Sequence, residues 1–248
     1  MASIKLKDID TRAPKEFEKK ETKDKLEKIL AELDDLQNLL YAESKHSLLI
    51  IIQGMDASGK DGAIRNVFGK INPQGVTVKS FKAPTAEELS HDFLWRIHTH
   101  APQKGMIQIF NRSQYEDILI TRVHKMIDDK EAKARINAIN NFEKLLSDHN
   151  DTTVLKFYLH ISPEEQQSRL QERIKIPEKR WKYNEQDFKE AKFWKDYMKM
   201  YEDCFEFCND TPWTIVPSDQ NWYKEYLIAN TVKETLKKFD MQYPGIKK

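Results

Sequence analysis

The sequence predicts an α/β fold with a mainly parallel sheet of five strands and helices on both of its faces. Five short apolar segments have the composition of strands, and segments with helical periodicity separate them along the chain. Strands that alternate with helices are joined by crossovers, which make the sheet parallel and place it in the middle of a three-layer sandwich. The 248 residues are enough for one core of this kind, and we expect 1–248 to form a single domain.

The first predicted strand, at 46–53 (HSLLIIIQ), is apolar on both of its alternating faces, which indicates a central strand buried on both sides. The other strand candidates lie at 76–84, 105–113, 152–162 and 213–219. The segments expected to be helical are 16–43, 60–70, 85–100, 115–147, 163–173, 187–208 and 220–239. Strands and helices therefore alternate along the chain, as the predicted sheet requires.

The segment at 16–43 has the clearest helical pattern. Its apolar residues recur at spacings of three and four, which is typical of an amphipathic helix. They are Leu26, Ile29, Leu30, Leu33, Leu36, Leu39 and Leu40. We expect residues 1–45 to form an N-terminal helical arm, and the apolar face of this long helix suggests a homo-oligomer.

The composition is that of a globular protein without membrane segments. The formal net charge is only +1, so any anion site has to come from a local cluster of cations. The N-terminus does not resemble a signal peptide, and no run approaches the ~20 apolar residues of a membrane span, so we expect a cytoplasmic protein. Cys204 and Cys208 lie four residues apart on one helix face, where disulfide geometry is poor, and we expect free thiols.

A glycine-rich segment, GMDASGK, directly follows the first predicted strand and precedes a predicted helix. In this context the pattern Gly-x-x-x-x-Gly-Lys is that of a phosphate-binding loop, or Walker A motif. Gly54 and Gly59 allow the intervening amides to turn toward phosphate oxygens, the helix N-terminus adds a partial positive charge, and Lys60 adds a full one. The residues expected to bind phosphate here are Gly54, Ala57, Ser58, Gly59, Lys60, Asp61 and Gly62.

Two acids make this loop unusual. Asp56 lies inside it, where a bare carboxylate would repel phosphate by about 4 kcal/mol per pair of charges at intermediate dielectric. A divalent cation between the two removes the repulsion, so Asp56 is interpreted as a magnesium ligand or, alternatively, as a base. Asp61 takes the place where such loops usually carry a Ser or Thr for magnesium. It either stabilises the helix N-terminus or contacts the nucleotide directly.

A second polar cluster, NRSQYED, follows the predicted strand at 105–113. Ligands of open α/β sheets gather at the carboxyl ends of the strands, so Arg112 is expected to emerge close to the loop. Arginine can bind phosphate oxygens with two hydrogen bonds, and Arg122 lies on the helix that follows. We therefore interpret this cluster as a second part of the phosphate site.

Two acids open the helix after this cluster. Asp117 is expected to complete a magnesium site begun by Asp56, because magnesium is commonly held by one or two carboxylates and by substrate phosphates. Glu116 has a simpler interpretation as a favourable negative charge at a helix N-terminus.

The stretch at 169–182 (RLQERIKIPEKRWK) carries six basic residues against two acidic ones. A run of this kind is most often a solvated helix face, and it is also compatible with nucleic-acid binding. The near-neutral chain and the absence of a nucleic-acid motif argue against the second use. Because the stretch lies where P-loop kinases have a lid that covers the phosphates and excludes water, we expect a lid at about 169–195.

Together these motifs resemble the polyphosphate kinase 2 family. The resemblance rests on GMDASGKDG, on SFKAPT with SHDFLWR, on IFNRSQYEDILITRVH and on the basic stretch with its Glu-Arg pair. NPQGV and FWKDYMKMYED also fit, and the segments follow the family's order over about residues 40–230. An aspartate inside the loop combined with Asn-Arg-Ser-x-Tyr-Glu is specific, whereas a phosphate-binding loop alone is not.

The resemblance implies a P-loop kinase of the thymidylate-kinase type with a five-stranded sheet and a helical lid. It implies catalytic roles for Asp56, Lys60, Arg112, Asp117 and Arg173, with Asn111 and Arg122 beside them. Relatives that read FKERAxWxxY carry a second lid arginine, whereas this chain reads DFKEAKFWKDY. Arg180 or Lys182 is expected to substitute for it.

The expected activity is transfer of the terminal phosphate of inorganic polyphosphate to a nucleoside mono- or diphosphate (AMP, ADP, GMP or GDP), reversibly and with Mg²⁺ or Mn²⁺. An extended polyanion needs a row of cations, and Lys79 and Lys82, if they are not ordinary surface lysines, extend such a row. We expect no nucleic-acid or membrane partner. Two alternatives stay open, an ATP-dependent small-molecule or nucleotide kinase of the P-loop class and a non-catalytic nucleotide-binding module.

Overall fold

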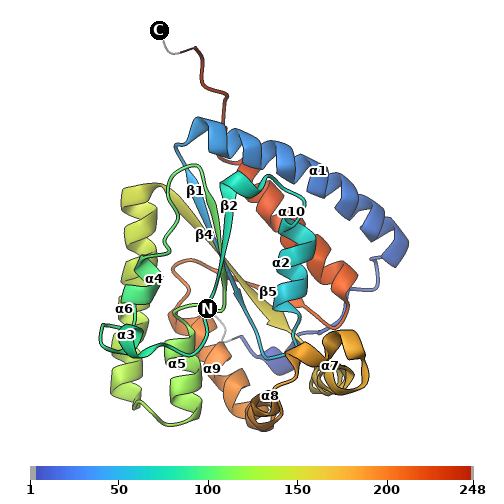
Figure 1. Ribbon diagram of the computed structural model, residues 1–248, viewed down its shortest axis with the longest axis vertical. Coiled ribbons are helices and arrows are strands. Elements are labelled where there is room, and N and C mark those ends of the chain that lie inside the picture. The colour runs from blue at the N-terminus through green and yellow to red at the C-terminus, as the bar shows by residue number, and fades with distance from the viewer. Residues whose placement is uncertain (1–3, 247–248) are drawn as a thin grey trace.

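The computed structural model of the chain describes residues 4–246 and has the expected α/β architecture (Figure 1). Residues 1–3 and 247–248 of the expected domain lie outside the described residues. The strands run parallel in the order β2-β3-β1-β4-β5, so the prediction of a mainly parallel, five-stranded sheet is confirmed. They are β1 (Ser47–Gln53), β2 (Val76–Ser80), β3 (Ile107–Asn111), β4 (Thr152–His160) and β5 (Trp213–Pro217).

β1 is the central strand of the sheet. All seven of its residues are buried, as the unbroken apolar run predicted. Its Ile51 lies between Phe110 of β3 and Lys156 of β4 in the parallel register. A strand buried on both faces requires helices above and below the sheet, and the segment that leaves its carboxyl end emerges between two neighbouring strands.

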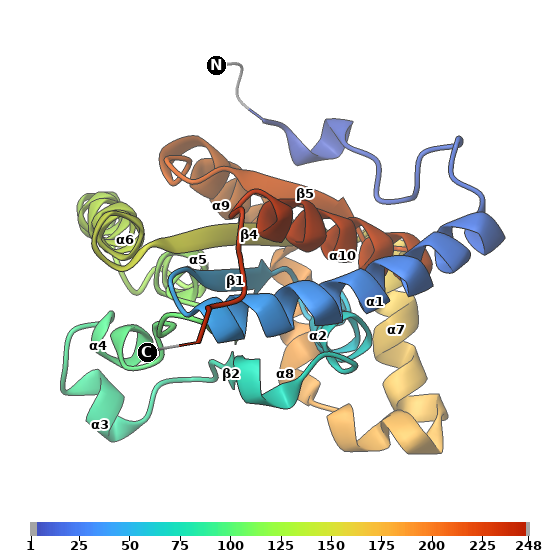
Figure 2. The same ribbon diagram turned by 90° about the horizontal axis from the view of Figure 1, so that it is seen from above.

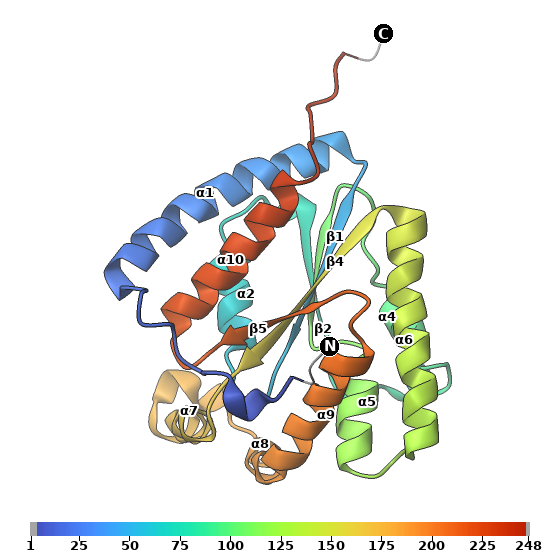
Figure 3. The same cartoon turned by 180° about the vertical axis from the view of Figure 1, so that it is seen from behind.

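One face of the sheet is covered by α1 (Lys19–Glu43), α2 (Lys60–Phe68) and α10 (Asn221–Lys237), which lie together on the left of Figure 3. Leu33, Val67 and Val232 of these helices belong to one buried cluster with alternate residues of β1. α1 packs along α10, so the apolar face of the predicted helix at 16–43 is used inside the chain. That face therefore no longer supports a homo-oligomer, which stays a prediction.

The opposite face is covered by α5 (Glu116–Val123), α6 (Asp129–Asn150) and α9 (Trp194–Phe207). Ile118, Phe142 and Phe205 of these helices form a second buried cluster with Leu49 and Ile51 of β1. The sheet thus has an apolar core on each side, and its carboxyl edge is left for polar residues.

Three predicted helices are wrong in extent because caps and turns divide them. The stretch at 85–100 contains only the short helices α3 (Ala86–Leu89) and α4 (Trp95–His98). Thr85 and Glu88 form a capping box that starts α3, and Asp92 accepts a hydrogen bond from the Leu94 amide at 2.9 Å before α4.

The predicted helix at 115–147 is α5 and α6 with a turn between them. Lys125 has a left-handed backbone (φ 55°) that ends the first helix, and Asp128 caps the second by accepting from the Glu131 amide at 2.7 Å. The first predicted strand ends at Gln53 as expected, whereas the other four end two to four residues earlier than predicted. The residues beyond those ends belong to the connections that enter the site.

The predicted helix at 187–208 is divided as well. After β4 the chain forms α7 (Pro163–Lys175), η3 (Pro177–Lys182), α8 (Glu185–Glu190) and η4 (Ala191–Phe193) before α9 begins. Pro177 lacks an amide hydrogen and ends α7, and the Asn184 side chain caps α8 by accepting from the Gln186 amide at 3.0 Å. We call residues 163–193 the lid segment; α7 and α8 project together from the carboxyl edge of the sheet (Figures 1 and 2).

The N-terminal segment before α1 lies against the domain. Its turn η1 (Leu6–Asp8) buries Leu6, whose amide donates to Glu202 of α9 at 2.9 Å. The His160 ring at the end of β4 donates to the Leu6 carbonyl at 3.1 Å, and Thr11 donates to Asp219 at 2.7 Å. These contacts tie the segment to the carboxyl edge of the sheet.

A buried ion pair joins β4 to α6 inside the second cluster. Lys156 Nζ lies 2.9 Å from Glu143 Oε2, and both side chains are almost completely buried. The same ammonium group donates to Tyr115 Oη at 2.9 Å and to the Cys208 carbonyl at 2.8 Å, and Tyr115 donates to Glu143 at 2.7 Å. Because Tyr115 directly precedes α5, this network fixes the point from which that helix starts.

The cysteine prediction agrees with the structure. Cys204 and Cys208 are both free thiols and both buried. Burial and the hydrogen bond between the two sulfur atoms raise the pKa of Cys204, with the hydrogen bond contributing most. None of the helices described here combines the length and hydropathy that crossing a bilayer demands.

Lys156→Met is expected to lower the free energy of unfolding by about 3–5 kcal/mol, because it leaves the Glu143 carboxylate buried without its cation. Urea denaturation measures the change. The matched control is Lys144→Met, which removes the exposed partner of Asp148 (3.0 Å) and should cost less than about 1 kcal/mol. A cost as small as the control's for Lys156→Met would contradict a structural role for the buried pair.

Candidate phosphate-binding site

The segment at 54–59 forms a tight loop between β1 and α2. Gly54, Ala57 and Gly59 have positive φ angles of 149°, 62° and 93°. A Cβ atom at Gly54 would lie 2.9 Å from the Leu159 carbonyl oxygen on β4, so the loop leaves β1 too close to that strand for a larger residue. Among the described residues no side chain caps α2, so its first amides are available to an anion.

Lys60 is buried and its ammonium group lies against the loop. Its Nζ donates to the carbonyl oxygens of Gly54 at 2.7 Å and Met55 at 3.0 Å. Burial lowers the pKa of Lys60 to about 8, and the positive charge of Arg112 contributes further. A cation that is destabilised by burial gains strongly from a nearby anion, so this position favours phosphate binding.

Asp61 links the loop to two other elements. Its carboxylate accepts from Asn111 Nδ2 at 2.9 Å and pairs with Lys182 Nζ at 2.8 Å. Burial acts to raise the pKa of Asp61, but the hydrogen bonds from Lys182 and Asn111 outweigh it and hold the pKa below its ordinary value. Asp61 therefore bridges β3 and the lid segment, a role that neither sequence interpretation contained.

Arg112 stands between two carboxylates at the end of β3. It pairs with Asp56 of the loop, and its Nη1 lies 3.2 Å from Glu116 Oε2. Glu116, and after it Asp56, raises the pKa of Arg112 above its ordinary value. Arg112 also has a left-handed backbone (φ 63°), which is uncommon for a residue with a side chain and typical of functional sites. The structure thus brings Asp56 and Arg112 together and adds Glu116.

Asp117 is paired with an arginine that sequence reasoning missed. Its carboxylate lies 3.4 Å from Arg96 Nη2 of α4, and burial raises the pKa of Asp117 although Arg96 opposes this. Within residues 4–246 no group of three or more His, Cys, Asp or Glu residues is arranged to hold a metal ion. The carboxylate oxygens of Asp56 and Asp117 suit magnesium, but they would fill only part of its coordination shell. Water and bound phosphates would have to supply the remaining ligands.

The two predicted lid arginines make their contacts within the lid segment. Arg173 pairs with Asp187 of α8 and donates to the Lys182 carbonyl at 3.1 Å, and Arg180 donates to the Ile174 carbonyl at 3.1 Å. Burial raises the pKa of Asp187, and the negative charge of Asp56 adds to this effect. The Arg173–Asp187 pair therefore lies within electrostatic reach of the loop.

The remaining predicted residues lie around the loop without a direct contact to it. Arg122 pairs with Asp203 of α9 at 2.8 Å and thus ties α5 to α9. Lys79 is the penultimate residue of β2 and Lys82 lies two residues beyond the strand, so both are near the carboxyl edge of the sheet. Gly62 is in the first turn of α2, where an added Cβ atom would meet nothing within 4 Å.

Three further residues contact the loop from behind. They are Gln166 and Arg169 of α7 and Lys224 of α10, which donate to loop carbonyl groups. Burial lowers the pKa of Lys224 to about 7, and the positive charge of Arg169 contributes further. Arg169 belongs to the basic stretch at 169–182, but the residues around it do not indicate a contact with the loop. The same is true of Lys224, because both contacts join segments that are far apart in the sequence.

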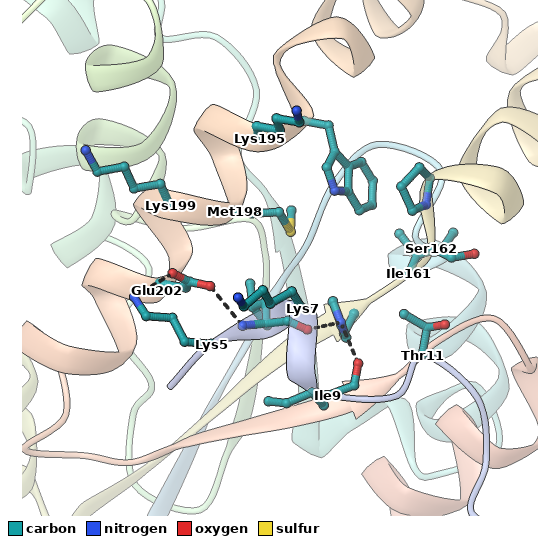
Figure 4. A pocket seen from close by; sticks show the side chains of 14 residues that line it. Lys5, Lys7, Ile9, Thr11, Ile161, Ser162, Lys195, Met198, Lys199 and Glu202 are labelled. Atoms are coloured by element: carbon teal, nitrogen blue, oxygen red, sulfur yellow. Dashed lines mark hydrogen bonds and ion pairs between the residues drawn. The ribbon is translucent and has the colours of Figure 1, made fainter. Parts of the chain in front are cut away.

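A cavity of about 560 Å³ lies elsewhere, between the N-terminal segment, the end of β4 and α9 (Figure 4). Its lining includes the apolar side chains of Trp194 and Met198 and the basic side chains of Lys7, Lys195 and Lys199. None of the predicted site residues lines it, so it is not the phosphate site.

Anion binding at the loop is expected to weaken as the pH rises. Sulfate is a suitable probe, because it remains a dianion while Lys60 (pKa about 8) and Lys224 (pKa about 7) lose their protons. An anion stabilises the charged form of each lysine, so affinity is highest below both pKa values and falls as the pH passes through them. Isothermal titration calorimetry from about pH 6 to about pH 9.5 measures this dependence.

In Lys60→Met the decrease in sulfate affinity near pH 8 should disappear. The control is Lys45→Met, which removes an exposed lysine that pairs with Glu43 at 2.9 Å, and it should keep the parent profile. Sulfate affinity that does not change with pH in the parent protein would contradict a role for the two lysines in anion binding.

Comparison with known proteins gives consistent relatives. The family model described as polyphosphate kinase 2 (PPK2) matches residues 16–244. A relative from Meiothermus ruber named AMP/ADP-polyphosphate phosphotransferase is 46% identical over 214 residues, which are 86% of this chain and 80% of the relative. A relative from Rhodopseudomonas palustris named ADP-polyphosphate phosphotransferase is 44% identical over 226 residues, which are 86% of this chain and 78% of the relative.

The solved structures agree with the sequence relatives. The crystal structure of polyphosphate kinase 2 from Arthrobacter aurescens TC1 has a TM-score of 0.95 to this chain at 39% identity, and the match covers 100% of this chain and 90% of that one. Its similarity extends over the sheet, both helical layers and the lid segment. The chain belongs to the polyphosphate kinase 2 family.

Proposed function

We propose that the protein transfers the terminal phosphate of inorganic polyphosphate to a nucleoside mono- or diphosphate, reversibly. The observation that carries the proposal is the contact of Asp56, inside the phosphate-binding loop, with Arg112 at the end of the neighbouring strand. This contact joins the two motifs on which the family resemblance rests. The names of the relatives from Meiothermus ruber and Rhodopseudomonas palustris contain polyphosphate and an adenine nucleotide, the two kinds of substrate in this proposal.

Phosphoryl transfer depends mainly on positioning and on neutralisation of charge, with little covalent work for the protein. The loop amides and Lys60 hold the transferring phosphate, and the helix N-terminus of α2 favours its negative charge. Arg112, permanently charged, binds a neighbouring phosphate with its planar fork. When it does so, the phosphate replaces Asp56 as a partner, and the Asp56 carboxylate becomes free for another ligand.

Asp56 and Asp117 are the residues that would hold magnesium. Their carboxylate oxygens are the ligands that magnesium prefers, and the remaining positions suit water and substrate phosphates. When bound, the ion would neutralise charge on the phosphates and keep them in line. Each carboxylate has an arginine partner in this structure. Metal binding would therefore replace the Asp56–Arg112 and Asp117–Arg96 ion pairs with bonds from the carboxylates to the metal ion.

The lid segment excludes water from the transferring phosphate. Lys182 pairs with Asp61 across the gap between η3 and α2, and Arg173 pairs with Asp187 inside the lid segment. Each of these cations could exchange its carboxylate for a phosphate oxygen when the substrate binds. We therefore assign Arg173 and Lys182 to the phosphate chain, with Arg180, Arg122, Lys79 and Lys82 as further cations around it.

The test is a matrix of donors and acceptors with the purified protein. Polyphosphate or ATP is supplied as donor, AMP, ADP, GMP or GDP as acceptor, and the products are separated by ion-exchange chromatography. We expect nucleoside di- and triphosphates with polyphosphate as donor. Turnover with ATP alone as donor would replace the proposal with an ATP-dependent kinase, and nucleotide binding without any turnover would replace it with a binding module.

Asp56→Asn and Asp117→Asn are each expected to lower turnover with polyphosphate by about a hundredfold or more, because each removes a charge that phosphoryl transfer needs. Circular dichroism should show an intact fold. The matched control is Asp148→Asn on the exposed side of α6, which should keep turnover unchanged. Turnover close to the parent value in either site variant would exclude that residue as a metal ligand.

A further inference from the structure

Every carbonyl group of the phosphate-binding loop accepts a hydrogen bond from a side chain. Each of the six residues from 54 to 59 has its carbonyl oxygen within reach of a side-chain donor. The donors are Lys60 for Gly54 and Met55, Gln166 for Asp56, Arg169 for Ala57 and Ser58, and Lys224 for Ser58 and Gly59. The distances run from 2.7 Å for Gly54 to 3.4 Å for the contact between Lys224 and Ser58.

This arrangement follows from what a phosphate-binding loop has to do. Its amides must point toward the anion, so its carbonyl groups must point away, into the protein. A buried carbonyl group without a donor costs free energy, and it turns back toward the solvent if the protein does not hold it. Side-chain donors behind the loop therefore decide the direction of the amides in front of it.

Lys224 shows that this support carries charge as well as hydrogen bonds. It is buried, its Nζ forms no ion pair with a carboxylate among the described residues, and its shortest hydrogen bond is donated to Asn221 Oδ1 at 2.8 Å. A Cβ atom at Gly59 would lie 2.3 Å from that Nζ, so glycine is required for lysine to approach the loop so closely. An unpaired buried cation directly beneath the loop favours an anion above it.

Arg169 connects the loop to two other segments. Its Nη1 donates to the carbonyl oxygens of Ala57 at 3.2 Å and Ser58 at 3.1 Å. Its Nη2 donates to those of Ser218 at 2.8 Å and Asp219 at 3.0 Å, after β5. Because Arg169 belongs to α7, the first helix of the lid segment, its side chain joins the base of the lid segment to the loop.

We propose that Gln166, Arg169 and Lys224 are positioning residues that hold the carbonyl groups of the phosphate-binding loop from behind and so direct its amides at the phosphate. The proposal rests on the proposed function for its effect on turnover, and on the geometry alone for its effect on anion binding. Lys60 takes the first two carbonyl groups in the same way and is already assigned to the phosphate.

The test compares Lys224→Met and Arg169→Lys with the parent protein. Lys224→Met removes both the donor and the charge, whereas Arg169→Lys keeps the charge and loses the planar fork that reaches four carbonyl groups. We expect the Kd for sulfate to rise at least about tenfold in Lys224→Met, and kcat with polyphosphate to fall about tenfold or more in both variants, because small misplacements in a phosphate site are costly.

The matched control is Lys233→Met, which removes another largely buried lysine of α10 whose partner is Glu234 at 3.0 Å. It should leave the Kd for sulfate and kcat within about twofold of the parent values. Urea denaturation of every variant gives the folded fraction. A purely structural role would reduce only that fraction, whereas a positioning role changes the Kd of the molecules that are folded.

Two results would overturn the proposal. One is a Kd for sulfate and a kcat that both stay within about twofold of the parent in folded Lys224→Met. The other, which decides the matter if Lys224→Met does not fold, is a parent-like kcat in folded Arg169→Lys. Absence of polyphosphate turnover in the parent would refute the proposed function alone, because the sulfate measurements on Lys224→Met would still decide the role of the support.

Discussion

The structure depends on the burial of β1 on both faces. All seven residues of this strand are inaccessible, so the sheet has to be covered twice, by α1, α2 and α10 on one side and by α5, α6 and α9 on the other. Two apolar layers of this kind leave polar residues only at the edges. The loop at 54–59 leaves β1 at its carboxyl end, where Leu159 of β4 lies close enough to exclude a side chain at Gly54. The position of the phosphate site is thus a consequence of core packing.

Charge is distributed unevenly around this loop. The chain as a whole is nearly neutral, yet Lys60, Arg169 and Lys224 lie under six consecutive residues, and burial lowers the pKa of both lysines. Such a cluster is unfavourable on its own, since burial and mutual repulsion both act against the charged forms. An anion above the loop relieves both effects. A protein of small net charge can therefore bind a polyanion, because the field is local and the cations are held by carbonyl groups.

Most of the charged site residues are paired with an opposite charge. Asp56 and Arg112, Asp117 and Arg96, Asp61 and Lys182, and Asp187 and Arg173 form four such pairs around the carboxyl edge. Each pair satisfies its members at partial burial, where a lone charge would be costly. In the proposed function a phosphate would replace the carboxylate and a metal ion would replace the cation, so that each member would keep a partner of opposite charge. Two of the pairs involve the lid segment, which links its position to the charge state of the site.

The sequence by itself determined the features that depend on residues adjacent in the chain. The apolar run of β1, the glycines of the loop, the lysine that follows and the parallel α/β class were all predictable, because strand burial and loop geometry are set within about ten residues. The long helices expected at 85–100, 115–147 and 187–208 were wrong in extent, since the Asp92 cap, the left-handed backbone of Lys125 and the 3-10 turn η4 divide them. Only the tertiary structure showed that Gln166, Arg169 and Lys224 support the loop. They lie more than a hundred residues from it in the chain, and no local pattern specifies a hydrogen bond over that separation.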